Sequence, residues 1–441
     1  MALSLNAETR PQYGGTLRIS SRASLSSLDP AVASLSDSLA ERNVSSLVFD
    51  TLVTFDKAGR PRPALAASWQ LSSAKQGCQL RLRPGVKLQD GTPLTPEIAA
   101  ASLRFANPAW SVQSTADSIV VENVNSNHDI LRDLSLARNA IVRRGTADQV
   151  PVGTGPFHIL DWDTGKKLVL GANDEYWGGR PYFDRIELSF GQSFRDQNIA
   201  LQLGKSDVIE VATEQSQRSA REGRQLTESA PVVLLALLFS RDANSPDEKT
   251  LRDSLRLSIE RNSIRDVLLK RTGVAAGGIL PTWISGYGFV FPATSDLTQA
   301  RQLRGSVKNA PTWRLSYHAS DPLDRLLAER IALNAHDAGL SLQPVSSGTA
   351  DLKLVRIPLE STDPWIALED LLDRCGMVAV NSGTSVQDLY VAEQNVLSTD
   401  RIIPLFHLPV SYEFFPAVKG WGVQSDGRLD LSNAWLEPAK P

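Results

Sequence analysis

The sequence has little of what marks membrane-spanning, disulfide-stabilised or nucleic-acid-binding proteins. Its 441 residues include two cysteines, Cys78 and Cys375, whose number and spacing fit neither a disulfide framework nor a metal-binding knuckle. No apolar run approaches the roughly 18 residues needed to span a bilayer. The formal charge of −3, from 46 basic and 49 acidic residues, gives no electrostatic reason to expect nucleic acid or an anionic membrane as a partner.

The common enzyme signatures are also missing. The sequence contains no GxSxG elbow, no HExxH helix, no Walker loop and no CxxC pair. We therefore predict no catalytic residues, no metal site and no cofactor. The five histidines are scattered without metal-ligand spacing: His128, His158, His318, His336 and His407.

The first residues leave the location of the protein open. Residues 1–12, MALSLNAETRPQ, are too short and too polar for a secretory signal, which fits a mature exported protein as well as a cytoplasmic one. Neither cysteine is N-terminal, so no lipid anchor is predicted.

Length and composition predict a globular protein of several domains. The chain of 441 residues exceeds the roughly 250–300 residues at which a single core stops growing, so two or three domains are expected. Its 42% hydrophobic and 22% charged residues are typical of globular proteins.

Residues 151–190 predict a module of short strands and turns. Gly153 and Gly155 allow positive φ values before the first strand. Strands are expected over Phe157–Trp162 and Lys167–Leu170, separated by an Asp-Thr-Gly turn. A third strand is predicted where apolar residues alternate: Ile186, Leu188 and Phe190.

Residues 312–345 predict a βαβ unit in which the two strands are parallel. Asp321 and Pro322 supply an N-cap and a proline at the first helical position, and Gly339 is placed to end the helix in a left-handed conformation. Residues 240–400 therefore read as an α/β lobe. One apolar face of the helix is formed at three- and four-residue spacing by Leu323, Leu326, Leu327 and Ile331.

Several segments have distinctive amino-acid sequences and follow one another in a fixed order. They are YGGTLRIS (13–20), SLDPA (27–31), PALAASW (63–69), LRLRPGVKLQDGTPLTPEIAAASL (80–103), VGTGPF (152–157), ANDEYWGGRPYFDRIEL (172–188), LRDSLRLSIERNSI (251–264) and IPLFH (403–407). Together they resemble the extracellular solute-binding proteins of family 5, the peptide/nickel class that serves ABC importers. The resemblance covers nearly the whole chain.

This resemblance implies an α/β, periplasmic-binding-protein-like class II fold in which two lobes are joined by a two-segment hinge. We expect a strand-rich lobe I at 13–238 plus 405–441, with a small subdomain at about 45–150, and an α/β lobe II at 239–404. The chain is expected to cross between the lobes near residues 237–243 and 400–408.

The resemblance also implies a site for the ligand's amine at Glu360. In peptide-binding members, an acid shortly before an acid-proline pair receives the amine. The matching run here is ADLKLVRIPLESTDPWIAL (350–368), in which Glu360 stands four residues before the proline of Asp363-Pro364. A carboxylate suits this role because a charge-assisted bond strengthens when closure excludes water. The alternative is a solvated loop glutamate.

The same run departs from the peptide-binding pattern at Pro358. Proline has no amide hydrogen, which weakens strand addition by a peptide ligand and leaves room for an opine, sugar or chelate. Arg356 either binds a ligand carboxylate or belongs to a surface alternation. Trp365 either stacks on a ligand or packs the lobe.

Loops that the resemblance places around the cleft contribute the remaining candidates. These are Trp283 and Tyr287 in lobe II, Ser240 and Arg241 after the crossing strand, and Arg22 and Leu28 in lobe I.

The sequence thus predicts the substrate-binding component of an ABC importer, not an enzyme. It would capture a small solute, a short peptide or another amine-bearing molecule, by lobe closure. We expect a monomer that works in the periplasm or elsewhere outside the cytoplasm and delivers the solute to the transmembrane subunits of a permease. Three alternatives stay open: the same fold binding a metal chelate, opine or sugar; a sensor or chaperone of the same fold that has no permease; and, from another class, a hydrolase that uses paired carboxylates.

Overall fold

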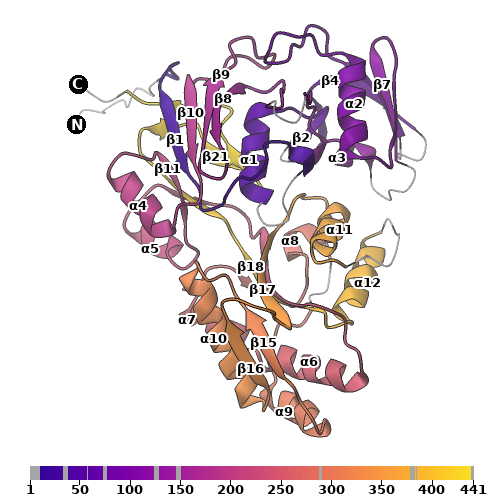
Figure 1. Ribbon diagram of the computed structural model, residues 1–441, viewed down its shortest axis with the longest axis vertical. Coiled ribbons are helices and arrows are strands. Elements are labelled where there is room, and N and C mark those ends of the chain that lie inside the picture. The colour runs from indigo at the N-terminus through magenta and orange to yellow at the C-terminus, as the bar shows by residue number, and fades with distance from the viewer. Residues whose placement is uncertain are drawn as a thin grey trace, which may run out of the picture.

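Two lobes lie one above the other along the long axis of the molecule, and lobe I contains both the first and the last described residues (Figure 1). A small subdomain lies beside the main sheet of lobe I. The computed structural model describes residues 10–32, 38–56, 58–72, 77–123, 129–145, 150–287, 291–377, 383 and 385–438.

The centre of lobe I is a seven-stranded sheet with the order β12-β19-β11-β1-β10-β9-β8. Strand β1 pairs in parallel with β10 and β11, and the other neighbours are antiparallel. The three strands predicted within 151–190 are β8, β9 and β10. The strand bounds are β1 (Thr16–Ser20), β8 (Phe157–Asp163), β9 (Lys167–Ala172), β10 (Arg185–Ser189), β11 (Val208–Val211), β12 (Leu226–Glu228) and β19 (Ser411–Phe414).

Helices and short hairpins complete lobe I. Helix α1 buries one face in the core beneath the sheet through Val44, Leu47 and Val48. The remaining elements are η1 (Pro30–Val32), α1 (Ser38–Val48), η2 (Ala137–Asn139), α4 (Phe194–Gln202), α5 (Ser216–Arg221), β20 (Val418–Lys419), β21 (Gly422–Val423), β22 (Leu429–Asp430) and β23 (Trp435–Leu436).

The glycines of the VGTGPF segment are required by close packing and not by positive φ values. Neither Gly153 nor Gly155 has a positive φ. A Cβ atom on Gly155 would lie 2.5 Å from the carbonyl carbon of Val48, and one on Gly153 would come closer still to the oxygen of that carbonyl. The N–H of Gly155 donates to the same oxygen at 3.0 Å. This turn therefore docks directly on the last residue of α1.

The small subdomain has a separate core. Its four-stranded antiparallel sheet has the order β4-β5-β7-β6. Leu80, Leu103 and Ile119 are buried there, together with Cys78, whose thiol pKa is raised to about 12 by burial. The elements are β2 (Val53–Phe55), β3 (Pro61–Pro63), β4 (Ala66–Leu71), β5 (Gly77–Leu82), α2 (Pro96–Ala106), β6 (Ser111–Ser114), β7 (Ser118–Glu122) and α3 (Ile130–Asp133).

Lobe II is built on a six-stranded sheet with the order β14-β18-β13-β17-β15-β16. Its strands are β13 (Val233–Phe239), β14 (Val274–Ala275), β15 (Thr312–Ser316), β16 (Ser341–Val345), β17 (Leu352–Pro358) and β18 (Ile402–Leu408). One face packs against α6 (Pro246–Ser258), α7 (Arg261–Val267) and α10 (Pro322–Asp337). The other packs against α8 (Thr282–Ser285), α11 (Pro364–Arg374) and α12 (Val386–Leu397). Helix α9 (Leu297–Ser306) lies beside α6.

The predicted βαβ unit is confirmed. Strands β15 and β16 pair in parallel, with α10 between them in sequence. The Asp321 side chain caps α10 by accepting from the N–H of Leu323 at 3.0 Å. Gly339 follows the helix with a φ of +83°, a conformation that glycine adopts at little cost.

The chain crosses between the lobes at residues 229–232 and 409–410, which differs from the predicted places. Both β13 and β18 belong to the sheet of lobe II. The predicted boundaries instead assign residues up to 238, and again from 405, to lobe I. The apolar run of β13 is almost fully buried because it is a central strand, and such a run gives no sign of which sheet it joins. The crossings hydrogen-bond to each other: Ser229 N donates to Val410 O, and Val410 N donates to Ser229 Oγ, both at 2.9 Å.

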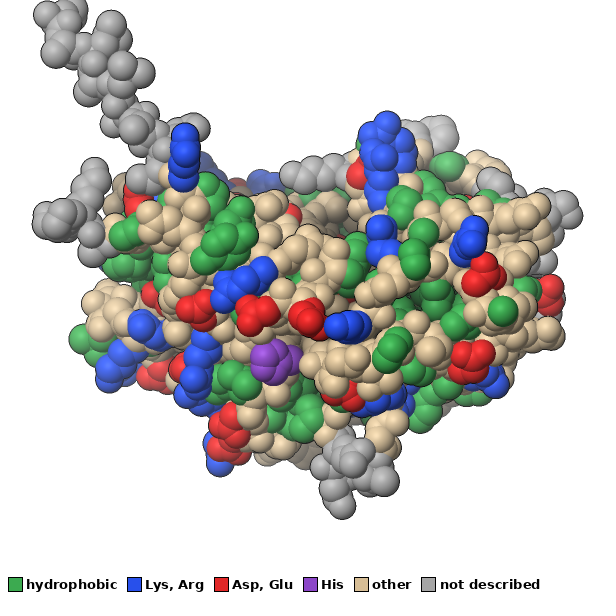
Figure 2. All heavy atoms as spheres, turned by 90° about the horizontal axis from the view of Figure 1, so that it is seen from above, with side chains coloured by type: hydrophobic (Ala, Val, Ile, Leu, Met, Phe, Trp, Pro, Cys, Tyr) green, Lys and Arg blue, Asp and Glu red, His purple; other side chains and the backbone are tan. Residues whose placement is uncertain are grey.

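On the face seen from above, acidic and basic side chains are interspersed among polar and small apolar areas (Figure 2). Within the described part of the chain, no helix is both long enough and apolar enough to cross a membrane.

Candidate functional site

Two groups of charged side chains connect the lobes. The first, called the Glu360 cluster, contains Glu360, Asp370 and Arg374 of lobe II with Arg138 of lobe I. The second, called the Arg356 cluster, contains Arg356, Asp321 and Asp324 of lobe II with Arg22 of lobe I.

Local structure explains where the lobe II members of the Glu360 cluster lie. Strand β17 ends at Pro358, and Asp363 caps α11 by accepting from the N–H groups of Trp365 and Ile366 at 3.1 and 3.3 Å. Glu360 lies in the short connection between these two elements. On α11, two further members stand four residues apart and form an ion pair at 2.9 Å: Asp370 and Arg374.

The carboxylate of Glu360 is already bound by guanidinium groups of the chain. Its Oε2 lies 2.9 Å from Arg138 Nη1 and 3.4 Å from Arg374 Nη2, and its side chain is 8% exposed. The backbone carbonyl of Glu360 accepts from Arg42 Nη1 of α1 at 3.5 Å. A cationic group of a ligand that approached Oε2 would therefore compete with Arg138 for it.

The pKa values of the two acids in the Glu360 cluster are shifted in opposite directions. Burial alone would raise the pKa of Glu360, but Arg138, a hydrogen bond from Asp370 and the charge of Arg374 outweigh it and lower that pKa to about 2. Burial and the negative charge of Glu360 raise the pKa of Asp370 to about 7. Of the two acids, Glu360 is therefore the one that ionises more readily and attracts Arg138.

The Arg356 cluster is built at the start of α10. Arg356 Nη2 donates to Asp324 Oδ1 at 2.6 Å, and Arg22 Nη1 reaches across to Asp321 Oδ2 at 2.7 Å. Although burial opposes ionisation, the charges of Arg356 and Arg22 lower the pKa of Asp321. Glu214 of lobe I lies close enough to interact with both arginines, and burial raises its pKa. Two arginines thus face three carboxylates.

The comparisons with known proteins agree with this two-lobed arrangement. A family model described as bacterial extracellular solute-binding proteins, family 5 Middle, matches residues 60–353, about two thirds of the chain. The chain belongs to this family.

Family 5 relatives match most of the chain at low identity. Heme-binding protein A of Haemophilus influenzae is 22% identical over 362 residues, which cover 70% of this chain and 66% of that protein. The probable D,D-dipeptide-binding periplasmic protein DdpA of Escherichia coli is 23% identical over 288 residues, which cover 58% of this chain and 55% of that protein. The matches thus span less than two thirds of the length of these relatives.

Solved structures of family 5 proteins match the fold over almost the full length. The dipeptide-binding protein of Pseudoalteromonas sp. SM9913, in complex with Met-Leu, has a TM-score of 0.83 at 15% identity, covering 96% of this chain and 100% of that one. NikA of Staphylococcus aureus, in complex with Ni(L-His)2, has a TM-score of 0.80 at 17% identity, covering 96% and 100%. The predicted two-lobe α/β fold is confirmed.

Three of the residues predicted to bind the ligand lie at the lobe interface, in two separate clusters. Arg22, Arg356 and Glu360 all take part in the two charged clusters. The structure gives each arginine a carboxylate of the chain as its partner, and it gives Glu360 an arginine.

Two candidates lie in the interior of a lobe. Leu28 is 5% exposed and packs in the core of lobe I. Trp365 is 9% exposed and packs in the core between the sheet of lobe II, α11 and α12. The surroundings of Trp365 therefore match the alternative in which its side chain packs the interior of the lobe.

Ser240 and Arg241 lie away from the lobe interface. Strand β13 runs from Val233, opposite Pro358, to Phe239, opposite Leu352. Ser240 thus lies roughly 23 Å along the sheet from the interface, at about 3.3 Å per residue. The prediction that they lie at the cleft depends on a crossing after β13, whereas the chain crosses before that strand.

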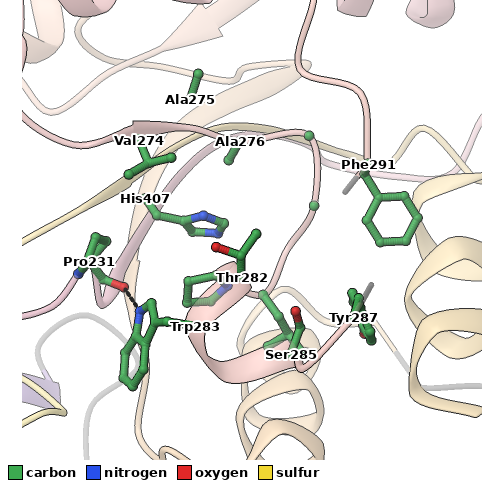
Figure 3. Close-up of a pocket in the computed structure, with 14 residues that line it drawn as sticks. Pro231, Val274, Ala275, Ala276, Thr282, Trp283, Ser285, Tyr287, Phe291 and His407 are labelled. Carbon is green, nitrogen blue, oxygen red and sulfur yellow. Dashed lines mark hydrogen bonds between the residues drawn. The ribbon is translucent and has the colours of Figure 1, made fainter. Parts of the chain in front are cut away.

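Trp283 and Tyr287 belong to a segment beside the hinge. Trp283 Nε1 donates to the carbonyl of Pro231 in the first crossing at 3.0 Å. Tyr287 donates its hydroxyl to Glu393 Oε2 at 2.8 Å. Both residues line the pocket drawn in Figure 3 and take no part in the two charged clusters.

Most of the partners in these clusters are not predicted from the sequence. Asp370 and Arg374 stand four residues apart on a helix, a pattern that could have indicated a paired face. Arg138 gives no such signal, because it lies in a short 3-10 turn 222 residues before Glu360.

The described residues contain no group of three or more His, Cys, Asp or Glu side chains arranged to hold a metal ion. A lobe I pocket has a volume of about 20 Å³, roughly enough for one water molecule. It is lined in part by Ser20, Asn43, Glu210 and Tyr412.

Proposed function

We propose that this chain is the substrate-binding component of an ABC importer and works outside the cytoplasm. It captures a small solute, a short peptide or another amine-bearing molecule, between its lobes and delivers it to a membrane permease without covalent chemistry. The observation that carries the proposal is the pair of crossing segments that joins two lobes whose facing surfaces bear complementary charges.

The energetics favour binding by closure over binding on an open surface. A micromolar solute needs about 8 kcal/mol of net free energy. An exposed ion pair contributes about 0–1 kcal/mol, so surface charges cannot supply it. Charges that lose water as the lobes close, such as those of Glu360 and Asp324, interact more strongly.

The ion pair between Glu360 and Arg138 gives the amine proposal a specific form. An ammonium group of the solute would have to replace the guanidinium of Arg138 on Glu360 Oε2, so that the solute and Arg138 compete for one carboxylate. The same ion pair also supports the second candidate, a solute without a free amine, such as an opine, sugar or chelate. Such a solute would not have to replace Arg138 on Glu360.

The identity of the solute can be tested directly. We expect mass spectrometry of molecules released by denaturing the purified protein to find a stoichiometric small molecule. Titration of that molecule back into the emptied protein should reduce the radius of gyration in X-ray scattering. Scattering profiles that superimpose with and without a bound, verified solute would contradict closure.

Variants of the ion pair separate the two solute classes. If an amine binds at Glu360, Glu360→Gln should weaken binding roughly tenfold or more, about 1.4 kcal/mol, because a charge-assisted bond is lost. Arg138→Gln should strengthen binding of the same solute, because its competitor is removed. Glu329→Gln, which changes an exposed ion pair on α10, is the matched control and should have no effect.

Calorimetry on these three variants gives a clear result in either direction. Unchanged affinity in Glu360→Gln would remove Glu360 from the site. Weakening by both Glu360→Gln and Arg138→Gln would show that the pair stabilises the closed form and does not compete with an amine.

A further inference from the structure

A pocket beside the hinge lies apart from both charged clusters. It has a volume of about 90 Å³ and lies between Pro231 of the first crossing, His407 near the end of β18 and the segment 274–287 (Figure 3). Trp283 lies at its edge, 41% exposed, and bonds to the Pro231 carbonyl. The walls of the pocket therefore come partly from lobe II and partly from the first crossing segment, which must move when the lobes open.

The walls of this pocket are apolar and uncharged. None of its 14 lining residues is Lys, Arg, Asp or Glu. His407 is 6% exposed, and its Nε2 bonds to the carbonyl of Ile279 at 2.9 Å. Because a carbonyl only accepts, Nε2 carries the hydrogen, and burial keeps the ring neutral by lowering its pKa to about 4. A charged ligand would find no partner here.

One lining side chain has an unused hydrogen-bonding group. Ser285 is 2% exposed, and Figure 3 shows its hydroxyl pointing into the pocket. Among the described residues, no hydrogen bond involves this hydroxyl. The hydroxyl is still reached by solvent, so a molecule that bonds to it from within the pocket takes the place of water there.

We propose that this pocket binds a neutral, mostly apolar molecule about the size of a single ring, held by the apolar walls and by a hydrogen bond to Ser285 Oγ. Benzene occupies an apolar protein cavity of about 150 Å³. The pocket measured here, about 90 Å³, is smaller but open to solvent, so part of such a ring would remain outside it. None of the residues that line it belongs to either charged cluster.

Binding of phenol and benzene to the full chain tests the proposal, with ligand-observed NMR titrations as the measurement. Phenol should bind saturably with a Kd on the order of 1 mM or tighter, since its hydroxyl can bond to Ser285. Ser285→Ala should weaken phenol about three- to tenfold and leave benzene unchanged. Ser306→Ala is the control, because Ser306 lies on α9 and bonds to Leu303 O; both probes should bind it as they bind the original protein.

A second variant fills the pocket. Ala276 lines it and is 3% exposed, so Ala276→Leu should occupy the space and abolish binding of both probes. Thermal unfolding shows whether this variant is folded; if it is not, the comparison of phenol with benzene in Ser285→Ala decides. The proposal is overturned if neither probe binds saturably, if Ser285→Ala weakens both probes equally, or if folded Ala276→Leu still binds them.

Discussion

At the scale of single residues, burial decides what several ionisable groups do. Glu360 and Arg138 meet across the lobes although 222 residues separate them, and each compensates the charge of the other. Glu393 and His407 are buried and form no ion pair within the described part of the chain, and both bond to the backbone of Ile279. Burial shifts the pKa of each toward its neutral form: to about 7 for Glu393 and to about 4 for His407.

Stability should depend on pH through His407. As the pH falls from about 6.5 to 4, histidine becomes protonated in the unfolded chain while His407 stays neutral in the folded one. The free energy of unfolding should therefore fall by up to about 3 kcal/mol from this residue. His407→Gln should remove that loss, as measured by urea unfolding at several pH values. An identical pH dependence in the variant would contradict the assignment.

Glu393 should act in the opposite direction over nearly the same pH range. Its folded pKa of about 7 exceeds the ordinary value of 4.5, so the folded state holds the proton more tightly. This stabilisation is fully present below pH 4.5 and is lost as the pH rises through 7. Glu393→Gln should therefore make the protein lose more stability than the original on acidification, because only the His407 effect remains. A smaller loss than the original would count against this prediction.

At the scale of elements, glycines and caps set how neighbouring segments dock. The turn with Gly153 and Gly155 lies against the end of α1 so closely that no Cβ fits. Asp321 and Asp363 each cap a helix of lobe II and stand beside an arginine of lobe I: Arg22 lies 2.7 Å and Arg132 3.9 Å away. The same residues that begin these helices thus also face the other lobe.

Gly155→Ala should destabilise the protein by about 1–3 kcal/mol, because its new methyl group would overlap the Val48 carbonyl. Gly305→Ala is a matched control on α9, where nothing lies within 4 Å of an added Cβ. That change should be neutral or stabilise the helix by about 0.5–1 kcal/mol. Denaturant unfolding of both variants checks the prediction, and equal effects would show that the packing of the turn is unimportant.

At the scale of the whole molecule, ion pairs across the interface favour the closed arrangement. Those of Arg22 and Arg138 are only partly exposed, with arginine side chains 28% and 37% accessible. The clusters lie at different elements of lobe II, one at the start of α10 and the other along α11 and the connection before it, so they restrain the interface at two places. The crossing segments hold the lobes together in either state.

Salt should shift the molecule toward an open form. Raising the ionic strength from about 0.1 to 1 M shortens the Debye length from about 10 to 3 Å and weakens such pairs. We expect the radius of gyration from X-ray scattering to increase with salt. The double variant Arg22→Ala/Arg138→Ala should be open already at low salt, whereas Arg325→Ala, which removes an exposed pair within α10, should behave like the original protein. Profiles that do not change with salt or in the double variant would argue against this role.

Local patterns in the sequence were sufficient for individual elements. The βαβ unit of β15, α10 and β16 follows from a cap, a helical period and a terminal glycine within 34 consecutive residues, 312–345. The strands β8, β9 and β10 follow from turns and alternation. The ordered segments also indicated the family, because they can be identified from the amino-acid sequence alone, without knowledge of tertiary contacts.

Only the tertiary structure decided which sheet each crossing strand joins and which charges meet. β13 and β18 are apolar on both faces, so their sequences suit a central strand of either lobe. The partner of Glu360 lies 222 residues away in the other lobe, and no local period or spacing can specify such a pair. Its formation depends on how two separately folded lobes approach each other, which is determined by the short paired crossings at 229–232 and 409–410.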